Sequence, residues 1–215
     1  LALWAALGAG AGAHAEVTVT GIDGALLANV LAYMDLDDEP CEAPRWRVER
    51  EYQAAPQEIG SALEALGHYA PAVERSLEFT DECWHAAFAI DPGPPVLLRN
   101  VDVAVMGEAA GDLAFADAVR GASLDVGDRL DHGAYEALKS RWSELAIERG
   151  YVEARLLENR IDVYPDALAA DVTLHFDSGP RYRFGSIQFE QDVLTERLIR
   201  AYLPFSSGDP FDNRA

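Results

Sequence analysis

The sequence predicts an α+β protein built from tandem β-α-α-β-β modules, each a small three-stranded mixed sheet with helices packed on one face. The first observation is a near repeat, Asp91-Pro92-Gly93-Pro94 and Asp177-Ser178-Gly179-Pro180, with an offset of 86 residues. Each block closes a segment of alternating apolar residues, which is typical of a half-buried strand. The second observation is that apolar residues recur at helical spacing between these strands. An 86-residue unit is too long for a solenoid repeat and long enough for a small domain.

In the first module, the apolar pattern changes from alternation to helical spacing and back. Pro56 interrupts the second helical stretch, and because proline favours the first turn of a helix, we expect a break near Ala55 and a new helix after it. Gly67 is expected to end that helix as a left-handed cap. The expected elements are a strand at 17–20, a helix at 26–34, helical stretches at 45–55 and 56–66, and strands at 69–79 and 83–90.

The second module repeats this order more clearly. Asp112 and Asp131 are expected to cap its two helices at their N-termini, and Gly150 is expected to end the second helix. Trp142 lies on the apolar stripe of that helix and is predicted to pack in the core, as Trp84 is in the first module. The expected elements are a strand at 97–105, helices at 113–119 and 132–149, and strands at 152–161 and 172–176.

A third module is expected to begin at Arg181, with a strand at 181–190 and a helix at 192–203 whose partners lie beyond Ala215. Gly208-Asp209-Pro210-Phe211-Asp212 resembles Gly127-Asp128-Arg129-Leu130-Asp131, which lies between the two helices of the second module. The predicted organisation is a signal-peptide remnant at 1–15, modules at 16–94 and 95–180, and the first half of a further module at 181–215.

The first fifteen residues predict export from the cytoplasm. They contain no charged side chain and end Ala13-His14-Ala15, the small-x-small spacing of a signal-peptidase site. The alternative is a short buried helix. After this stretch the chain carries the whole net charge of −20, which disfavours binding to nucleic acid or to anionic lipid headgroups.

Cys41 and Cys83 are the only cysteines. An even number in an oxidising compartment permits a disulfide across the first module, and two separately buried thiols are the alternative. The spacing is not that of a CxxC pair, and two thiols with scattered histidines do not make a zinc site.

Several segments resemble the POTRA modules of the TamA family, the outer-membrane subunits of the translocation and assembly module. The resemblance extends from Val17 to Ala215, but the first module lacks the Gly-Asp-x-hydrophobic-Asp linker and has an acidic loop with Cys41 instead. The segments are Ala65-Leu66-Gly67-His68-Tyr69-Ala70-Pro71, Glu148-Arg149-Gly150-Tyr151, Ser178-Gly179-Pro180-Arg181-Tyr182-Arg183-Phe184-Gly185 and Pro204-Phe205-Ser206-Ser207-Gly208-Asp209.

The resemblance implies a non-enzymatic scaffold on the periplasmic face of the bacterial outer membrane. It implies POTRA-like domains followed by a membrane-embedded barrel outside this sequence. The implied partners are a TamB-like inner-membrane-anchored protein and unfolded outer-membrane or autotransporter polypeptides. The alternatives are the POTRA region of a BamA-like assembly factor or secretion pore and, from another class, a secreted hydrolase with no recognisable motif.

The resemblance also implies that the second strand of each module is a sheet edge. An open edge has unpaired N–H and C=O groups to which an extended client can add as another strand. The alternative is that charged residues on these strands (Glu74, Arg75, Glu78, Glu153, Arg155 and Glu158) only protect the edges. The candidate strand-addition residues are Ala72, Val73, Glu74, Arg75, Ser76, Leu77, Glu78 and Phe79 in the first module, and Val152, Glu153, Ala154, Arg155 and Leu156 in the second.

Catalytic motifs are absent from the sequence. It contains no GxSxG, HExxH, Walker or CxxC pattern, and its histidines fall in separate predicted elements. We therefore expect no catalytic, metal or cofactor site.

Overall fold

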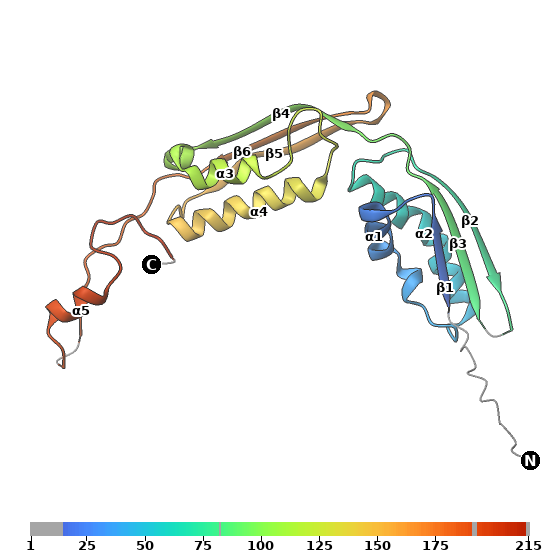
Figure 1. Cartoon of the computed structure of the whole chain (residues 1–215), viewed down its shortest axis with the longest axis horizontal. Helices are drawn as coiled ribbons and strands as arrows, with labels where there is room; N and C mark the ends of the chain where they lie inside the picture. The colour runs from blue at the N-terminus through green and yellow to red at the C-terminus, as the bar shows by residue number, and fades with distance from the viewer. Residues whose placement is uncertain (1–14, 82, 191–192, 214–215) are drawn as a thin grey trace, which may run out of the picture. The chain divides into compact units, whose positions relative to one another are not determined.

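The computed structural model describes residues 15–81, 83–190 and 193–213 (Figure 1). The predicted signal segment falls outside these residues apart from Ala15. The chain divides between Pro95 and Val96 into two compact units, which we describe separately. Among the described residues, no helix has the length and apolarity needed to cross a membrane.

The first unit is a three-stranded mixed sheet with helices on one face (Figure 1). The central strand β3 pairs in parallel with β1 and antiparallel with β2, so that β1 and β2 are the edges. Its elements are β1 (Glu16–Thr20), α1 (Gly24–Tyr33), a 3₁₀ turn η1 (Asp35–Asp38), α2 (Arg45–Glu64), β2 (Ala72–Phe79) and β3 (Trp84–Asp91).

The core of this unit lies between the sheet and helices α1 and α2. β3 alternates strictly between buried and exposed residues, and Trp84 and Phe88 are its largest buried side chains. The indole N–H of Trp84 donates to the carbonyl of Pro40 at 3.0 Å, which satisfies a buried donor. A disulfide joins Cys41 to Cys83, whose Cα atoms are 4.6 Å apart, and ties the loop before α2 to the start of β3.

The predicted helix break near Ala55 is wrong, because α2 continues through Pro56. One buried stripe holds both halves against the sheet (Val48, Ala55, Ile59, Ala62 and Leu63). Proline has no N–H to donate to the carbonyl four residues earlier, that of Tyr52. The guanidinium of Arg75 on β2 donates to that carbonyl instead. This hydrogen bond from β2 therefore supplies the donor that Pro56 cannot give to the α2 backbone.

The second unit repeats the same order and pairing, with β6 central and β4 and β5 at the edges. The side chains of Asp112 and Asp131 accept from the amides of Ala114 and Ala134, which confirms both predicted caps. Its elements are β4 (Leu97–Met106), η2 (Gly107–Gly111), α3 (Leu113–Arg120), α4 (His132–Arg149), β5 (Arg155–Tyr164), η3 (Pro165–Ala167), β6 (Ala169–Asp177) and α5 (Glu196–Tyr202).

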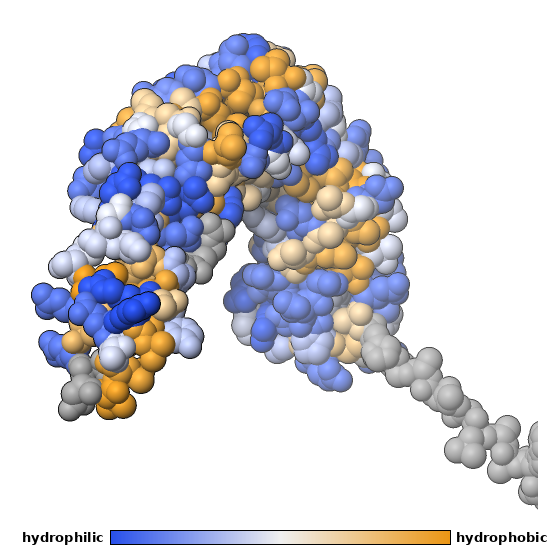
Figure 2. All heavy atoms as spheres, turned by 60° about the vertical axis from the view of Figure 1, so that its left-hand side comes forward, coloured by the Kyte–Doolittle hydropathy of each residue, from blue (hydrophilic) through white to orange (hydrophobic). Residues whose placement is uncertain are grey.

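The predicted strand at 181–190 does not form. Among the described residues, this segment pairs with no strand, and its ladder contact is an isolated bridge between Arg183 and Pro210. The helix is also shorter than predicted, since α5 spans Glu196–Tyr202. Figure 2 shows apolar atoms gathered on the C-terminal segment (residues 181–190 and 193–213), whose exposed large apolar residues are Tyr182, Val193, Leu194, Leu198 and Tyr202.

The C-terminal segment nevertheless repeats a local arrangement of the second module. Near β4, the amide of Leu98 donates to Asp128, Gly127 donates back to Leu98, and Leu130 donates to Val96. In the C-terminal segment, Phe184 donates to Asp209, Gly208 to Phe184 and Phe211 to Tyr182 in the same pattern. The side chains of Asp128 and Asp209 each accept from the amide three residues earlier. The similar Gly-Asp motifs therefore make the same turn against the chain.

The C-terminal end of α4 is satisfied by this segment rather than by its own helix. The carbonyls of Glu148, Arg149 and Gly150 accept from the amide of Asn213, the guanidinium of Arg181 and the amide of Tyr182, at 2.7–2.8 Å. Carbonyls in the last turn of a helix have no intrahelical partner, and a cation there also complements the helix dipole. Gly150 itself has φ +82°, and a Cβ at this position would lie 2.7 Å from the Cβ of Phe211.

Beside this helix end, Asp112 accepts from Arg149 Nε at 2.6 Å and from the Tyr151 hydroxyl at 3.2 Å. Burial alone would raise the pKa of the Asp112 carboxyl, but the hydrogen bonds from Arg149, Ala114 and Tyr151 outweigh it and lower the pKa below its ordinary value. The carboxylate therefore links the start of α3 to the end of α4.

We predict that Trp142→Ala destabilises the second unit by about 3–5 kcal/mol, because Trp142 is fully buried and packs against Phe176 at 5.5 Å between ring centroids. Denaturant unfolding measures the loss. Ile147→Ala, on the same helix but 66% exposed, is the matched control and should change the free energy of unfolding by less than about 0.5 kcal/mol. A loss below about 1 kcal/mol for Trp142→Ala would contradict this packing.

We predict that replacing Cys41 and Cys83 with serine destabilises the first unit by about 4 kcal/mol. The bridged residues are 42 apart, and closing a loop of that length restricts the unfolded chain. Adding a reductant should weaken the wild-type protein and leave the double variant unchanged. Equal denaturation midpoints for oxidised and reduced wild type would show that the bridge does not stabilise the unit.

Candidate strand-addition site

The two sheets leave four edge strands: β1, β2, β4 and β5. An edge accepts an added strand only where its outward N–H and C=O groups are continuous and uncovered. Differences in regularity and coverage distinguish these edges.

β2 is a regular edge of eight residues. It pairs with β3 without a register shift, from Ala72 opposite Asp91 to Phe79 opposite Trp84. The amide of Thr80 donates to the carbonyl of Cys83, which fixes the phase of the ladder. In an antiparallel pair, residues whose backbone groups face the partner alternate with residues whose groups face away. The residues that present N–H and C=O to the open side are therefore Val73, Arg75, Leu77 and Phe79.

The corresponding edge of the second module differs from the prediction. β5 begins at Arg155, so that Val152, Glu153 and Ala154 lie before it in a turn. The amide of Ala154 donates to the carbonyl of Tyr151 and holds that turn. The alternating sequence pattern did not reveal this, because the turn follows directly from the left-handed cap at Gly150.

β5 is also irregular, with a register shift between Leu156 and Glu158. A bulge leaves one residue unpaired and increases the local twist, which hinders the addition of a flat strand. Two of the charged residues expected to protect this region are engaged. Arg155 pairs with Asp177 at 3.2 Å, and Glu153 accepts from the Tyr182 hydroxyl at 2.8 Å.

The remaining edges are partly blocked or short. β4 has a shift between Leu98 and Asn100, and the backbone of Leu98 is already bonded to Gly127 and Asp128. β1 has five residues. Among the edges that the structure describes, β2 is the one that combines length with an unbroken register.

Side chains on the two faces of β2 have different environments. Those facing α2 are half-buried, and those on the opposite face, Glu74, Ser76 and Glu78 among them, are exposed. On the helix side, Arg75 lies 4.5 Å over the ring of Tyr52 and donates to Gln53 Oε1 at 3.0 Å, and Arg45 lies 4.5 Å over the ring of Phe79. The alternative interpretation gave Arg75 a protective role at the edge, but its guanidinium is bonded to α2 instead.

The outer face of the first sheet is shallowly depressed along its central strand, because the exposed side chains at its middle are small. Ala87 of β3 is exposed between Thr18 on β1 and Ser76 on β2, and Ala89 is exposed between Thr20 and Glu74. A shallow depression of about 280 Å³ covers this region. An added strand would therefore extend a flat surface.

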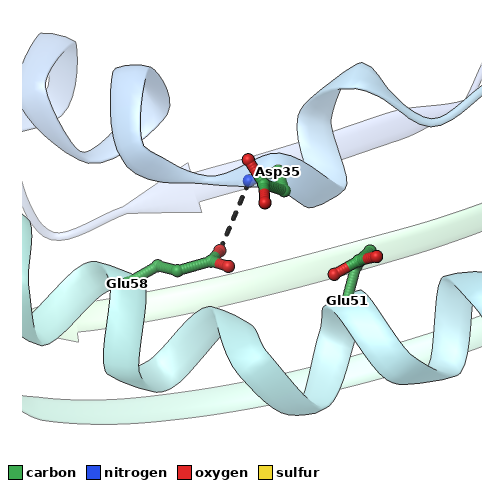
Figure 3. Close-up of side chains that lie close together, drawn as sticks. All are labelled: Asp35, Glu51 and Glu58. Atoms are coloured by element: carbon green, nitrogen blue, oxygen red, sulfur yellow. Dashed lines mark hydrogen bonds between the residues drawn. The ribbon is translucent and has the colours of Figure 1, made fainter.

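The first unit also contains a cluster of three acids: Asp35, Glu51 and Glu58 (Figure 3). Glu58 Oε2 accepts from the amide of Asp35 at 3.3 Å, and Glu51 pairs with Arg50. Burial, together with the neighbouring charges of Asp35 and Glu51, raises the pKa of the Glu58 carboxyl. These contacts account for the cluster as part of the packing between η1 and α2.

A protein-family model described as POTRA domain TamA domain 1 matches residues 16–92. The first unit is therefore similar to a POTRA domain over nearly its whole described length. The match corresponds to one β-α-α-β-β unit, from the start of β1 to just beyond β3.

Solved structures of POTRA domains are similar to the chain at low sequence identity. POTRA domains 3–5 of Haemophilus influenzae BamA share 16% identity over 94% of this chain and 81% of that chain, with a TM-score of 0.44. POTRA domains 1–3 of Omp85 from Anabaena share 18% identity over 93% of this chain and 79% of that chain, with a TM-score of 0.35.

Proposed function

We propose that this chain is the periplasmic POTRA region of an outer-membrane protein assembly factor, and that it binds extended client segments by strand addition to β2. The observation that carries the proposal is the regular row of open backbone groups at Val73, Arg75, Leu77 and Phe79 in a unit similar to a POTRA domain. Backbone hydrogen bonds depend little on client sequence, which suits a domain that handles many unfolded strands.

The proposed clients are unfolded outer-membrane or autotransporter polypeptides, and the proposed partner is a TamB-like protein anchored in the inner membrane. The family match to the first POTRA domain of TamA favours this assignment over a BamA-like factor. The apolar N-terminal sequence and the disulfide between Cys41 and Cys83 support a periplasmic location.

For the domain organisation, we propose modules at 16–94 and 95–180, with a third module beginning at 181. The support for the third is the repeated turn, in which the amides of Phe184, Gly208 and Phe211 make the bonds that Leu98, Gly127 and Leu130 make in the second module. We assign the chain a scaffold role and no catalytic residues.

We predict that a photoreactive residue in place of Ser76 captures a denatured outer-membrane barrel polypeptide diluted into the reaction. Ser76 is an exposed residue in the middle of β2, so its side chain would lie beside an added strand. The matched control is the same residue at Arg160, an exposed position on the irregular edge β5. Several-fold higher capture at Ser76 is the expected result. Equal capture at both positions would contradict a preference for β2.

A further inference from the structure

We propose that the β2 edge selects extended segments with two basic side chains four positions apart on one face and apolar side chains on the other. This inference rests on the proposed strand addition and specifies the class of client. It follows from the two differently built faces of β2, which an added strand would continue.

The outer face supplies negative charge. Glu74 and Glu78 are both exposed, and neither forms an ion pair within the part of the chain that the structure describes. The two lie four residues apart on one strand, a distance of about 13 Å at 3.3 Å per residue. Directly opposite cross-strand pairs of unlike charge are favourable, and pairs of like charge are unfavourable. Client side chains opposite these two positions should therefore be Lys or Arg.

The helix-facing side chains of β2 supply apolar contact, and none of the four is a carboxylate. Val73 and Leu77 are half-buried there, and the Arg75 and Arg45 guanidinium groups are stacked on the rings of Tyr52 and Phe79. The N–H groups of Arg75 also donate hydrogen bonds to the Tyr52 carbonyl and to Gln53. A client side chain on this side meets stacked ring faces and aliphatic groups, which favour apolar residues.

The charge of the whole chain acts in the same direction. A net charge of −20 attracts basic segments at long range and repels acidic ones, and this steering weakens as salt rises. The local pair of carboxylates adds a requirement of spacing that the overall charge cannot impose.

Fluorescence anisotropy with three labelled peptides tests the proposal on the full chain. The basic peptide has lysines four positions apart, valine on the alternate face and serine between the lysines. The acidic peptide has glutamates in place of the lysines. The third peptide is the basic one with N-methyl groups on the amides that would donate to the β2 carbonyls. We expect the basic peptide to bind at least about tenfold more tightly than the acidic one.

Two double variants separate local charge from overall charge. Glu74→Gln with Glu78→Gln should bring the affinities for the basic and acidic peptides close together. Glu136→Gln with Glu144→Gln on α4 makes the same change in net charge on exposed residues of the second unit, and should keep most of the preference. Equal loss of preference in both double variants would overturn the assignment to Glu74 and Glu78.

The N-methylated peptide distinguishes this inference from the proposed function. If the basic and acidic peptides bind equally well and the N-methylated basic peptide does not bind, strand addition stands and the charge selection is wrong. If the N-methylated basic peptide binds as tightly as its parent, charge alone drives binding and the strand addition is wrong. If no peptide binds, both are wrong.

Discussion

The hydrogen bond from Arg75 to the Tyr52 carbonyl is the interaction on which the candidate site depends. Pro56 leaves that carbonyl without its usual helical donor, and Arg75 supplies one from the neighbouring strand. The same side chain stacks on the Tyr52 ring, which lies 5.8 Å from the ring of the core residue Phe88. One residue thus couples the middle of α2 to β2 and to the core. It holds the edge strand in place while leaving its outward backbone groups open.

The two units share one topology but differ in how they treat their edges. In the first, β2 keeps an unbroken register, and the disulfide fixes the loop before α2 to the adjoining end of β3. In the second, shifts interrupt both β4 and β5. The C-terminal end of α4 is instead bonded to residues of the C-terminal segment, through Arg181 among others. The regular edge that the proposed strand addition needs is therefore found in the first unit.

Local patterns predicted most of the fold. The 86-residue offset, the caps at Asp112 and Asp131, and the core positions of Trp84 and Trp142 are all visible as spacing or as residue type. The continuity of α2 was missed because tertiary contacts support it: the buried stripe on both sides of Pro56, and the hydrogen bond from Arg75, 19 residues further along the sequence. The strand expected at 181–190 did not form because alternation cannot supply a partner strand, and among the described residues its ladder pairing is limited to the isolated bridge between Arg183 and Pro210.

The candidate site could be predicted only in part from the sequence. The residues of β2 were predicted, whereas Val152–Ala154 proved to lie in a turn. Which edge is regular depends on bulges, and these arise from pairing between strands rather than from the pattern of either strand. A proline in a helical stretch, together with an inward-facing arginine on a neighbouring strand, is a sequence signal that could have indicated a continuous helix.

Residue-resolved amide hydrogen exchange of the full chain, with and without a bound client strand, tests strand addition to β2 most directly. Client binding is predicted to slow exchange at Val73, Arg75, Leu77 and Phe79, whose amides face the open side. Glu74, Ser76 and Glu78 should change little, because their amides are already bonded to β3. This two-residue alternation would be the mark of a new strand. Binding that slows all β2 amides alike, or slows only amides elsewhere in the chain, would contradict the account.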